Sequence, residues 1–121
     1  MLIYEYDVFK MAHQMVLDTY AVTKNFPEEE KYGLTIQMRR SASSIPMNLA
    51  EGSSKASKKD FARFVDMASG SCEELRYQYY LAKGLGYIGP DVHLEKERSL
   101  ESIKKMLSGL KQSLLEKIKQ R

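Results

Sequence analysis

The segment that decides the fold is residues 58–86, KKDFARFVDMASGSCEELRYQYYLAKGLG. Its apolar side chains recur every three or four residues for about six turns, which is the spacing of one face of an α-helix. The members of this face are Phe61, Phe64, Val65, Ala68, Cys72, Leu75, Tyr79 and Ala82. Gly84 and Gly86 follow, and glycine commonly ends a helix because it adopts left-handed backbone angles. The sequence therefore predicts a long amphipathic helix that starts at about Lys58, with Ser57 as its N-cap.

Two further helices are predicted before this one. Apolar residues at helical spacing predict the first over residues 7–24. Pro27 suits the first turn of the second, because proline lacks the N–H that would be unpaired there. Glu28, Glu29 and Glu30 then lie near the positive end of the helix dipole. We therefore expect the second helix to start at Pro27.

The second helix contains a proline in its interior. Its apolar positions are Leu34, Met38, Ala42, Ile45 and Leu49, so the periodicity continues past Pro46. A proline inside a helix removes one hydrogen bond and clashes with the preceding turn. The sequence therefore predicts a kink or a break near residues 43–46, and a loop at residues 52–57.

A fourth helix is predicted from Pro90 to the end of the chain. Its near-heptad stripe consists of Leu100, Ile103, Leu107, Leu110, Leu114 and Ile118. No alternating apolar pattern typical of a β-strand interrupts the series, and short connections favour antiparallel neighbours. The predicted fold is all-α, an antiparallel up-down-up-down four-helix bundle that forms a single domain over residues 1–121.

Composition and cysteine count exclude several protein classes. The 121 residues are 43% hydrophobic and 29% charged, which suits a chain with a packed interior rather than a disordered one. One cysteine cannot form an intramolecular disulfide, and with two histidines it supplies too few ligands for a zinc finger. No run of about 18 apolar residues occurs. We expect a cytoplasmic protein without a metal, a cofactor or a membrane contact.

The sequence contains no recognisable catalytic motif. Di-iron bundles use Glu-x-x-His pairs, but Lys10 and Pro90 stand three residues before His13 and His93. No G-x-x-x-x-G-K loop for phosphate binding is present. Cys72 lies on the apolar face described above, where a buried and inert thiol is expected. We therefore expect a protein without catalytic residues that is not an enzyme.

Residues 39–52 form the least generic part of the chain. Small side chains here and at residues 68–71 would let the second and third helices approach closely. In this interpretation Gly70 permits the approach, and Arg40 forms a partly buried ion pair with Glu74. Asn48 and Glu51 would satisfy backbone groups near Pro46. A ligand-binding role for Arg40 remains the alternative.

An ordered set of motifs carries a resemblance to a known family. The motifs are Tyr20-x-x-Thr23-x-x-Phe26-Pro27-x-x-Glu30-x-Tyr32-Gly33-Leu34-x-x-Gln37-Met38-Arg39-Arg40-Ser41, then Ser44-Ile45-Pro46-x-Asn48-x-Ala50-Glu51-Gly52, then Phe61-x-x-Phe64-x-x-x-Ala68-x-Gly70-Ser71-x-x-Glu74 and Leu85-Gly86-Tyr87. Over about residues 8–110 the chain resembles the four-helix-bundle proteins encoded in intervening sequences of bacterial 23S ribosomal RNA genes. It departs at Ser41, where alanine is usual, and at residues 53–55, where the family's loop often carries an aromatic residue and an arginine.

The resemblance implies a bacterial homopentamer without a demonstrated enzymatic activity. A related branch, the accessory protein of diversity-generating retroelements, binds nucleic acid and a reverse transcriptase. The net charge of +3 is mild, but residues 104–121 contain six basic side chains and one acidic side chain. Arg39 and Arg40 match positions of the family, and local charge adds Lys55, Lys58, Lys59, Arg63, Lys104, Lys105 and Lys111 as predicted contacts to RNA or DNA. The alternative for the residues added from charge is an ordinary solvated helix face.

A second hypothesis is a scaffold for protein–protein interaction. Tyr77, Tyr80 and Tyr87 form a second face beside the apolar face of the third helix, and surplus aromatic surface often marks an interface. The partner could be a second copy, a reverse transcriptase or a ribosome-associated protein. The alternative is that these tyrosines only widen the core, with their hydroxyls at its rim.

Overall fold

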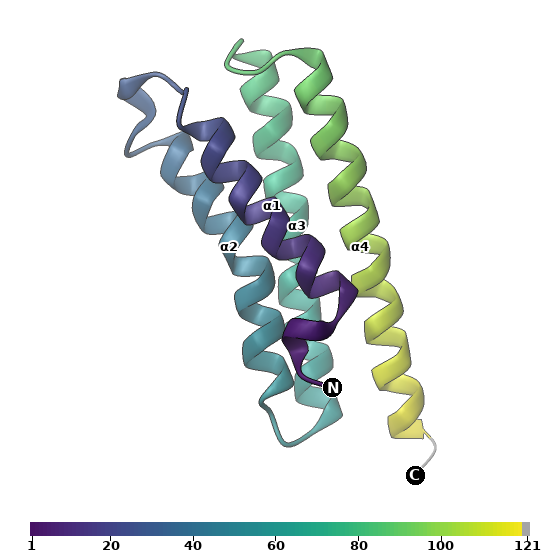
Figure 1. The fold of residues 1–121 in the computed structure, drawn as a ribbon. Coiled ribbons are helices and arrows are strands. Elements are labelled where there is room, and N and C mark those ends of the chain that lie inside the picture. The colour runs from purple at the N-terminus through teal and green to yellow at the C-terminus, as the bar shows by residue number, and fades with distance from the viewer. Residues whose placement is uncertain (120–121) are drawn as a thin grey trace.

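Four helices run alternately up and down in the computed structural model, which describes residues 1–119 (Figure 1). They are α1 (Asp7–Thr23), α2 (Leu34–Ser53), α3 (Lys58–Gly84) and α4 (Pro90–Lys119), with short 3-10 turns η1 (Ile3–Glu5) and η2 (Glu28–Glu30). No strand occurs among the described residues. The predicted all-α antiparallel four-helix bundle is therefore confirmed, while any extension of the last helix past Lys119 lies outside the described residues.

The apolar face of α3 forms the centre of the core. Val65, Ala68, Cys72, Leu75 and Tyr79 are fully buried. Around them pack the buried side chains Ala12 and Met15 of α1, Met38, Ile45 and Leu49 of α2, and Leu100, Ile103 and Leu107 of α4. Burial of such apolar surface is the main force that holds the helices together.

α3 ends as its glycines predict. Gly86 has a positive φ of 79°. The N–H of Tyr87 donates to the carbonyl of Ala82 (2.9 Å) and the N–H of Gly86 donates to that of Lys83 (3.0 Å). These two bonds form a Schellman motif, which satisfies carbonyls that the last turn would leave unpaired.

The predicted start of the second helix is wrong. Residues after Pro27 form only η2, and α2 begins at Leu34. The backbone leaves helical geometry at Gly33 (φ −108°, ψ −114°). The Glu30 side chain folds back, and its Oε1 accepts a hydrogen bond from the N–H of Leu34 (3.1 Å). A Cβ at position 33 would lie 2.7 Å from that oxygen, so glycine makes room for the carboxylate.

Of the kink or break predicted near Pro46, the break does not occur. α2 is helical from Leu34 through Ser53, and Pro46 is buried within it. Side chains supply hydrogen bonds to carbonyls on both sides: Ser43 Oγ donates to Arg39 O (2.6 Å) and Asn48 Nδ2 donates to Ser44 O (2.8 Å). Packing of the apolar face against the core keeps the helix continuous despite the missing N–H.

The close approach of α2 and α3 occurs at a different glycine from the predicted one. A Cβ at Gly70 would meet nothing within 4 Å, so the structural role predicted for Gly70 is wrong. A Cβ at Gly52 would lie 2.6 Å from the Cβ of Phe64 and 3.0 Å from Cδ1 of Phe61. Gly70 does not bring the two helices together, because it lies on the outer, exposed side of α3.

The predicted ion pair between Arg40 and Glu74 is also wrong. Glu74 Oε1 instead accepts a hydrogen bond from Ser41 Oγ (2.6 Å), and Arg40 is exposed. Ser44 and Ser71 add a second contact between the same helices, with 2.7 Å between their hydroxyl oxygens. Small polar side chains, rather than an ion pair, therefore line this seam. Glu51 has an exposed side chain, and the structure places no hydrogen bond on its carboxylate within the described range.

Candidate nucleic-acid interface

Four lysines gather at one end of the bundle. Lys55 lies in the loop between α2 and α3, Lys58 and Lys59 form the first turn of α3, and Lys117 lies near the end of α4. We call these four residues the basic end. They line two adjoining cavities of about 220 and 200 Å³, which share the segment 56–58.

Chain topology brings these lysines together. The up-down order places the loop after α2 and the last turns of α4 at the same end (Figure 1). Lys117 was absent from the predicted site, although the basic last segment of the sequence contained it. The excess of basic residues over residues 104–121, combined with the antiparallel order of the helices, could have identified Lys117 as part of this site.

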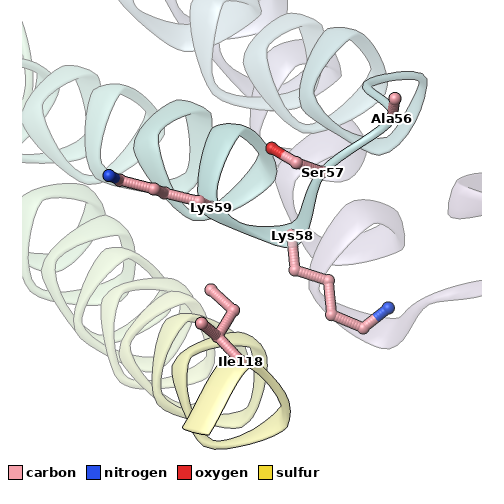
Figure 2. Close-up of a pocket in the computed structure, with 5 residues that line it drawn as sticks. All are labelled: Ala56, Ser57, Lys58, Lys59 and Ile118. Carbon is pink, nitrogen blue, oxygen red and sulfur yellow. The ribbon is translucent and has the colours of Figure 1, made fainter. Parts of the chain in front are cut away.

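The start of α3 adds positive potential to the basic end. Ser57 has an extended backbone, and its Oγ accepts a hydrogen bond from the N–H of Asp60 (3.1 Å), so it caps the helix as predicted. In Figure 2 the side chains of Lys58 and Lys59 leave α3 in different directions, with Ile118 of α4 facing this turn. The N-terminal end of a helix carries a partial positive charge, which adds to that of the lysines.

The lysines of the basic end form no ion pair among residues 1–119, although Lys55 lies over the Phe64 ring, with 5.2 Å between its Nζ and the ring centre. Across residues 1–119, no carboxylate forms an ion pair with Lys55, Lys58, Lys59 or Lys117. All four side chains belong to exposed residues. They can therefore contact an anionic partner without first breaking an ion pair with another residue of the described chain.

The three predicted lysines of α4 have a different environment. Lys104 contacts Glu73, Lys105 contacts Glu101 (3.4 Å) and Lys111 contacts Asp66 (2.8 Å). The hydrogen bond from Lys104 lowers the pKa of the Glu73 carboxyl, with Arg76 adding to the effect. Lys104 and Lys111 thus join α3 to α4, and the acidic partners offset their charge. Their role in nucleic-acid binding stays a prediction.

The predicted arginines are not grouped in one site. Arg63 lies 3.9 Å from Asp60 and its guanidinium is 4.8 Å from the centre of the Phe64 ring. Arg40 is exposed on α2. Arg39 is half-buried against α1, where its Nε donates to Thr23 Oγ1 (2.9 Å). Arg63, in the second turn of α3, is therefore the one nearest in sequence to the basic end.

The structure separates the three predicted interface tyrosines. Tyr77 and Tyr80 are 62% and 60% exposed, and their ring centres are 6.5 Å apart on α3. Tyr87 instead packs on Phe26, with 5.1 Å between ring centres, and donates a hydrogen bond to Glu30. The prediction that Tyr77, Tyr80 and Tyr87 share one face is therefore wrong for Tyr87. The turn at Gly86 directs the chain toward the α1–α2 connection instead.

The cysteine lies in the interior. Cys72 is fully buried, and its Sγ donates to the carbonyl of Leu100 (3.4 Å). Burial raises the pKa of the thiol to about 11, so the thiolate needed for nucleophilic attack is scarce at neutral pH. Among the residues that the structure describes, no three His, Cys, Asp or Glu side chains come together as metal ligands. Within the same range no helix combines the length and apolar character needed to cross a membrane.

Comparison with known proteins places the chain in a family. A family model described as 23S rRNA-intervening sequence protein matches residues 4–109. The chain belongs to this family. The family resemblance stated from the sequence motifs is thereby confirmed.

A solved structure supports the fold of this family member. It is the crystal structure of a protein of unknown function from the S23 ribosomal protein family of Bacteroides thetaiotaomicron VPI-5482. The two chains are 22% identical with a TM-score of 0.76, over 85% of this chain and 96% of the other. At this identity the likeness concerns the fold alone. No curated protein matches the sequence.

Proposed function

We propose that this member of the 23S rRNA-intervening sequence protein family is a non-enzymatic homo-oligomer that binds RNA or DNA. The observation that carries the proposal is the basic end, where four exposed lysines without an ion pair among residues 1–119 gather at the start of α3. Such a surface recognises the phosphate backbone, with weak preference for base sequence.

Assembly would strengthen this contact. Five copies, the number that the family resemblance suggests, multiply both the basic end and the net charge of +3 fivefold. Several weak sites on one particle bind a long polyanion more tightly than one site does. Light scattering should therefore give a mass that is a multiple of the single chain, and a monomer at micromolar concentration would contradict the pentamer.

The decisive experiment removes charge from the basic end. In the Lys58→Gln/Lys59→Gln variant, binding to a DNA duplex and to an RNA hairpin should weaken, and the slope of log K against log salt should fall by about two for each copy of the basic end that contacts the nucleic acid. A matched control, Lys10→Gln/Arg98→Gln, removes the same charge from exposed positions outside the basic end. The control should keep the wild-type slope, and both variants should keep the wild-type Tm.

A protein–protein scaffold is the second candidate function, and the exposed Tyr77 and Tyr80 favour it. In that case a reverse transcriptase or a ribosome-associated protein would bind the tyrosine pair, and nucleic acid would be incidental. Tyr77→Ser/Tyr80→Ser would then abolish partner capture. If the wild-type protein holds nucleic acid equally well in low salt and at about 0.5 M salt, a phosphate-driven contact is contradicted.

A further inference from the structure

A separate cationic cavity lies at the corner between α1 and α2. This corner is at the opposite end of the bundle from the basic end (Figure 1). The cavity has a volume of about 190 Å³. Its polar lining consists of Thr23, Lys24, Glu28, Lys31, Thr35 and Arg39. Three cationic side chains therefore face one carboxylate.

Arg39 is held in place by contacts with α1. Its Nε donates to Thr23 Oγ1 (2.9 Å) and its Nη2 donates to the carbonyl of Tyr20 (3.5 Å). The guanidinium lies 4.5 Å from the centre of the Tyr20 ring. Thr23 in turn donates its hydroxyl proton to the carbonyl of Thr19 (2.7 Å), so its oxygen is oriented to accept from Arg39. None of these contacts uses the N–H groups of Nη1.

The charge of this cavity is only partly neutralised by the residues that the structure describes. Within residues 1–119 neither Arg39 nor Lys24 forms an ion pair. Lys31 lies 3.9 Å from Glu28, and the two side chains are 60% and 90% exposed, so this pair is weak. The C-terminal end of α1 carries a partial negative charge, which disfavours an anion in this cavity. Arg39 offsets part of this effect, because its Nη2 donates to the Tyr20 carbonyl at that end.

We propose that this cavity binds a phosphate group. A preorganised guanidinium is suited to a phosphate, because its planar N–H groups match two phosphate oxygens. Lys24 and Lys31 supply further charge at the mouth, and the buried Thr35 contributes a hydroxyl to the lining. The phosphate is either free inorganic phosphate or the terminal phosphate of a strand. The site does not depend on the basic end.

The test follows backbone amide signals by NMR during titration with inorganic phosphate, against chloride at equal ionic strength. The amides of Thr23, Lys24 and Thr35 should shift and saturate. Lys24→Gln and Arg39→Gln should each weaken the affinity about tenfold, as expected for loss of one charge-assisted hydrogen bond. Lys24 is exposed and has no ion pair in the described chain, so its variant tests the site even where Arg39→Gln disturbs the contact with α1.

Arg98→Gln is the control, since Arg98 is an exposed arginine of α4 that does not line the cavity. An equal loss in this variant would overturn the proposal, as would the absence of saturable shifts. Shifts confined to the amides of Lys58 and Lys59 would overturn the proposed phosphate site in the cavity but leave the proposed function intact.

Titration with two short oligonucleotides, one with a 5′-phosphate and one with a 5′-hydroxyl, distinguishes free inorganic phosphate from the terminal phosphate of a strand. A response at the cavity to the phosphorylated strand alone would assign the site to strand ends. A response to inorganic phosphate and to neither strand would assign it to free phosphate.

Discussion

The hydroxyl of Tyr87 donates a hydrogen bond to Oε2 of Glu30 over 2.7 Å and joins the α3–α4 connection to the α1–α2 connection. The other carboxylate oxygen accepts from the N–H of Leu34, the first residue of α2. One carboxylate therefore caps a helix and links two connections that are distant in sequence. The bond from Tyr87, and then that from Leu34, lowers the pKa of Glu30. The same hydrogen bond raises the pKa of Tyr87.

This relationship predicts a pH-dependent contribution to stability. A carboxyl whose pKa is lower in the folded state stabilises the fold above its unfolded pKa, here 4.5, and loses that effect as pH falls through the folded value. Glu30→Gln should therefore lower the Tm at neutral pH, and the difference from wild type should shrink toward about pH 3. Glu29→Gln, at an exposed neighbour, is the control and should follow the wild type. An equal Tm difference at both pH values would contradict the role of the charge.

Two glycines should respond in opposite directions to alanine. Gly52→Ala places a Cβ 2.6 Å from the Cβ of Phe64 and should destabilise the fold by about 1–3 kcal/mol through overpacking. Gly70→Ala meets no atom within 4 Å and should stabilise α3 by about 0.5–1 kcal/mol, because glycine weakens a helix interior. Urea unfolding measures both. Similar losses in the two variants would show that position 70 is packed as tightly as position 52.

A buried hydrogen bond between α1 and α3 should be costly to break from one side. The hydroxyl oxygens of Thr19 and Tyr79 lie 2.7 Å apart, and both residues are fully buried. Burial raises the pKa of Tyr79 to about 12, which keeps its hydroxyl neutral. Thr19→Val leaves that hydroxyl unpaired and should cost about 1–3 kcal/mol in urea unfolding. Thr19→Val/Tyr79→Phe should cost less than the two single changes together, and simple additivity would argue against coupling.

The thiol of Cys72 should be protected in the folded protein. Burial, and then the nearby Glu73 carboxylate, raises its pKa to about 11. Alkylation by iodoacetamide near neutral pH should therefore require unfolding, and its rate should rise with urea in step with the unfolded fraction. Rapid stoichiometric labelling without denaturant would show that the thiol is accessible.

The success of the helix predictions has a physical reason. The apolar period of α3 and the glycines at its end are local properties of the chain, so both could be identified without tertiary information. The start of α2 could not be found in this way. The acidic run after Pro27 suited the first turn of a helix, but the Glu30 carboxylate is held by Tyr87, which lies 57 positions later.

The candidate site was only partly visible in the sequence. Lys55, Lys58 and Lys59 are near one another along the chain, so local charge was enough to group them. Lys117 joins them only because α4 returns to the same end of the bundle. By contrast, the sequence did not show that Lys111 forms an ion pair, because its partner Asp66 is far away along the chain. In the structure Asp66 of α3 lies 2.8 Å from Lys111.

By itself, the sequence determined the four helices, their antiparallel order and the family, because periodicity, connection length and motif order are properties of the linear chain. Only the tertiary structure decided which charges remain unpaired, which glycine is crowded and which oxygen caps α2. Those properties depend on distances between side chains from different helices, and such distances are set by packing rather than by position along the chain.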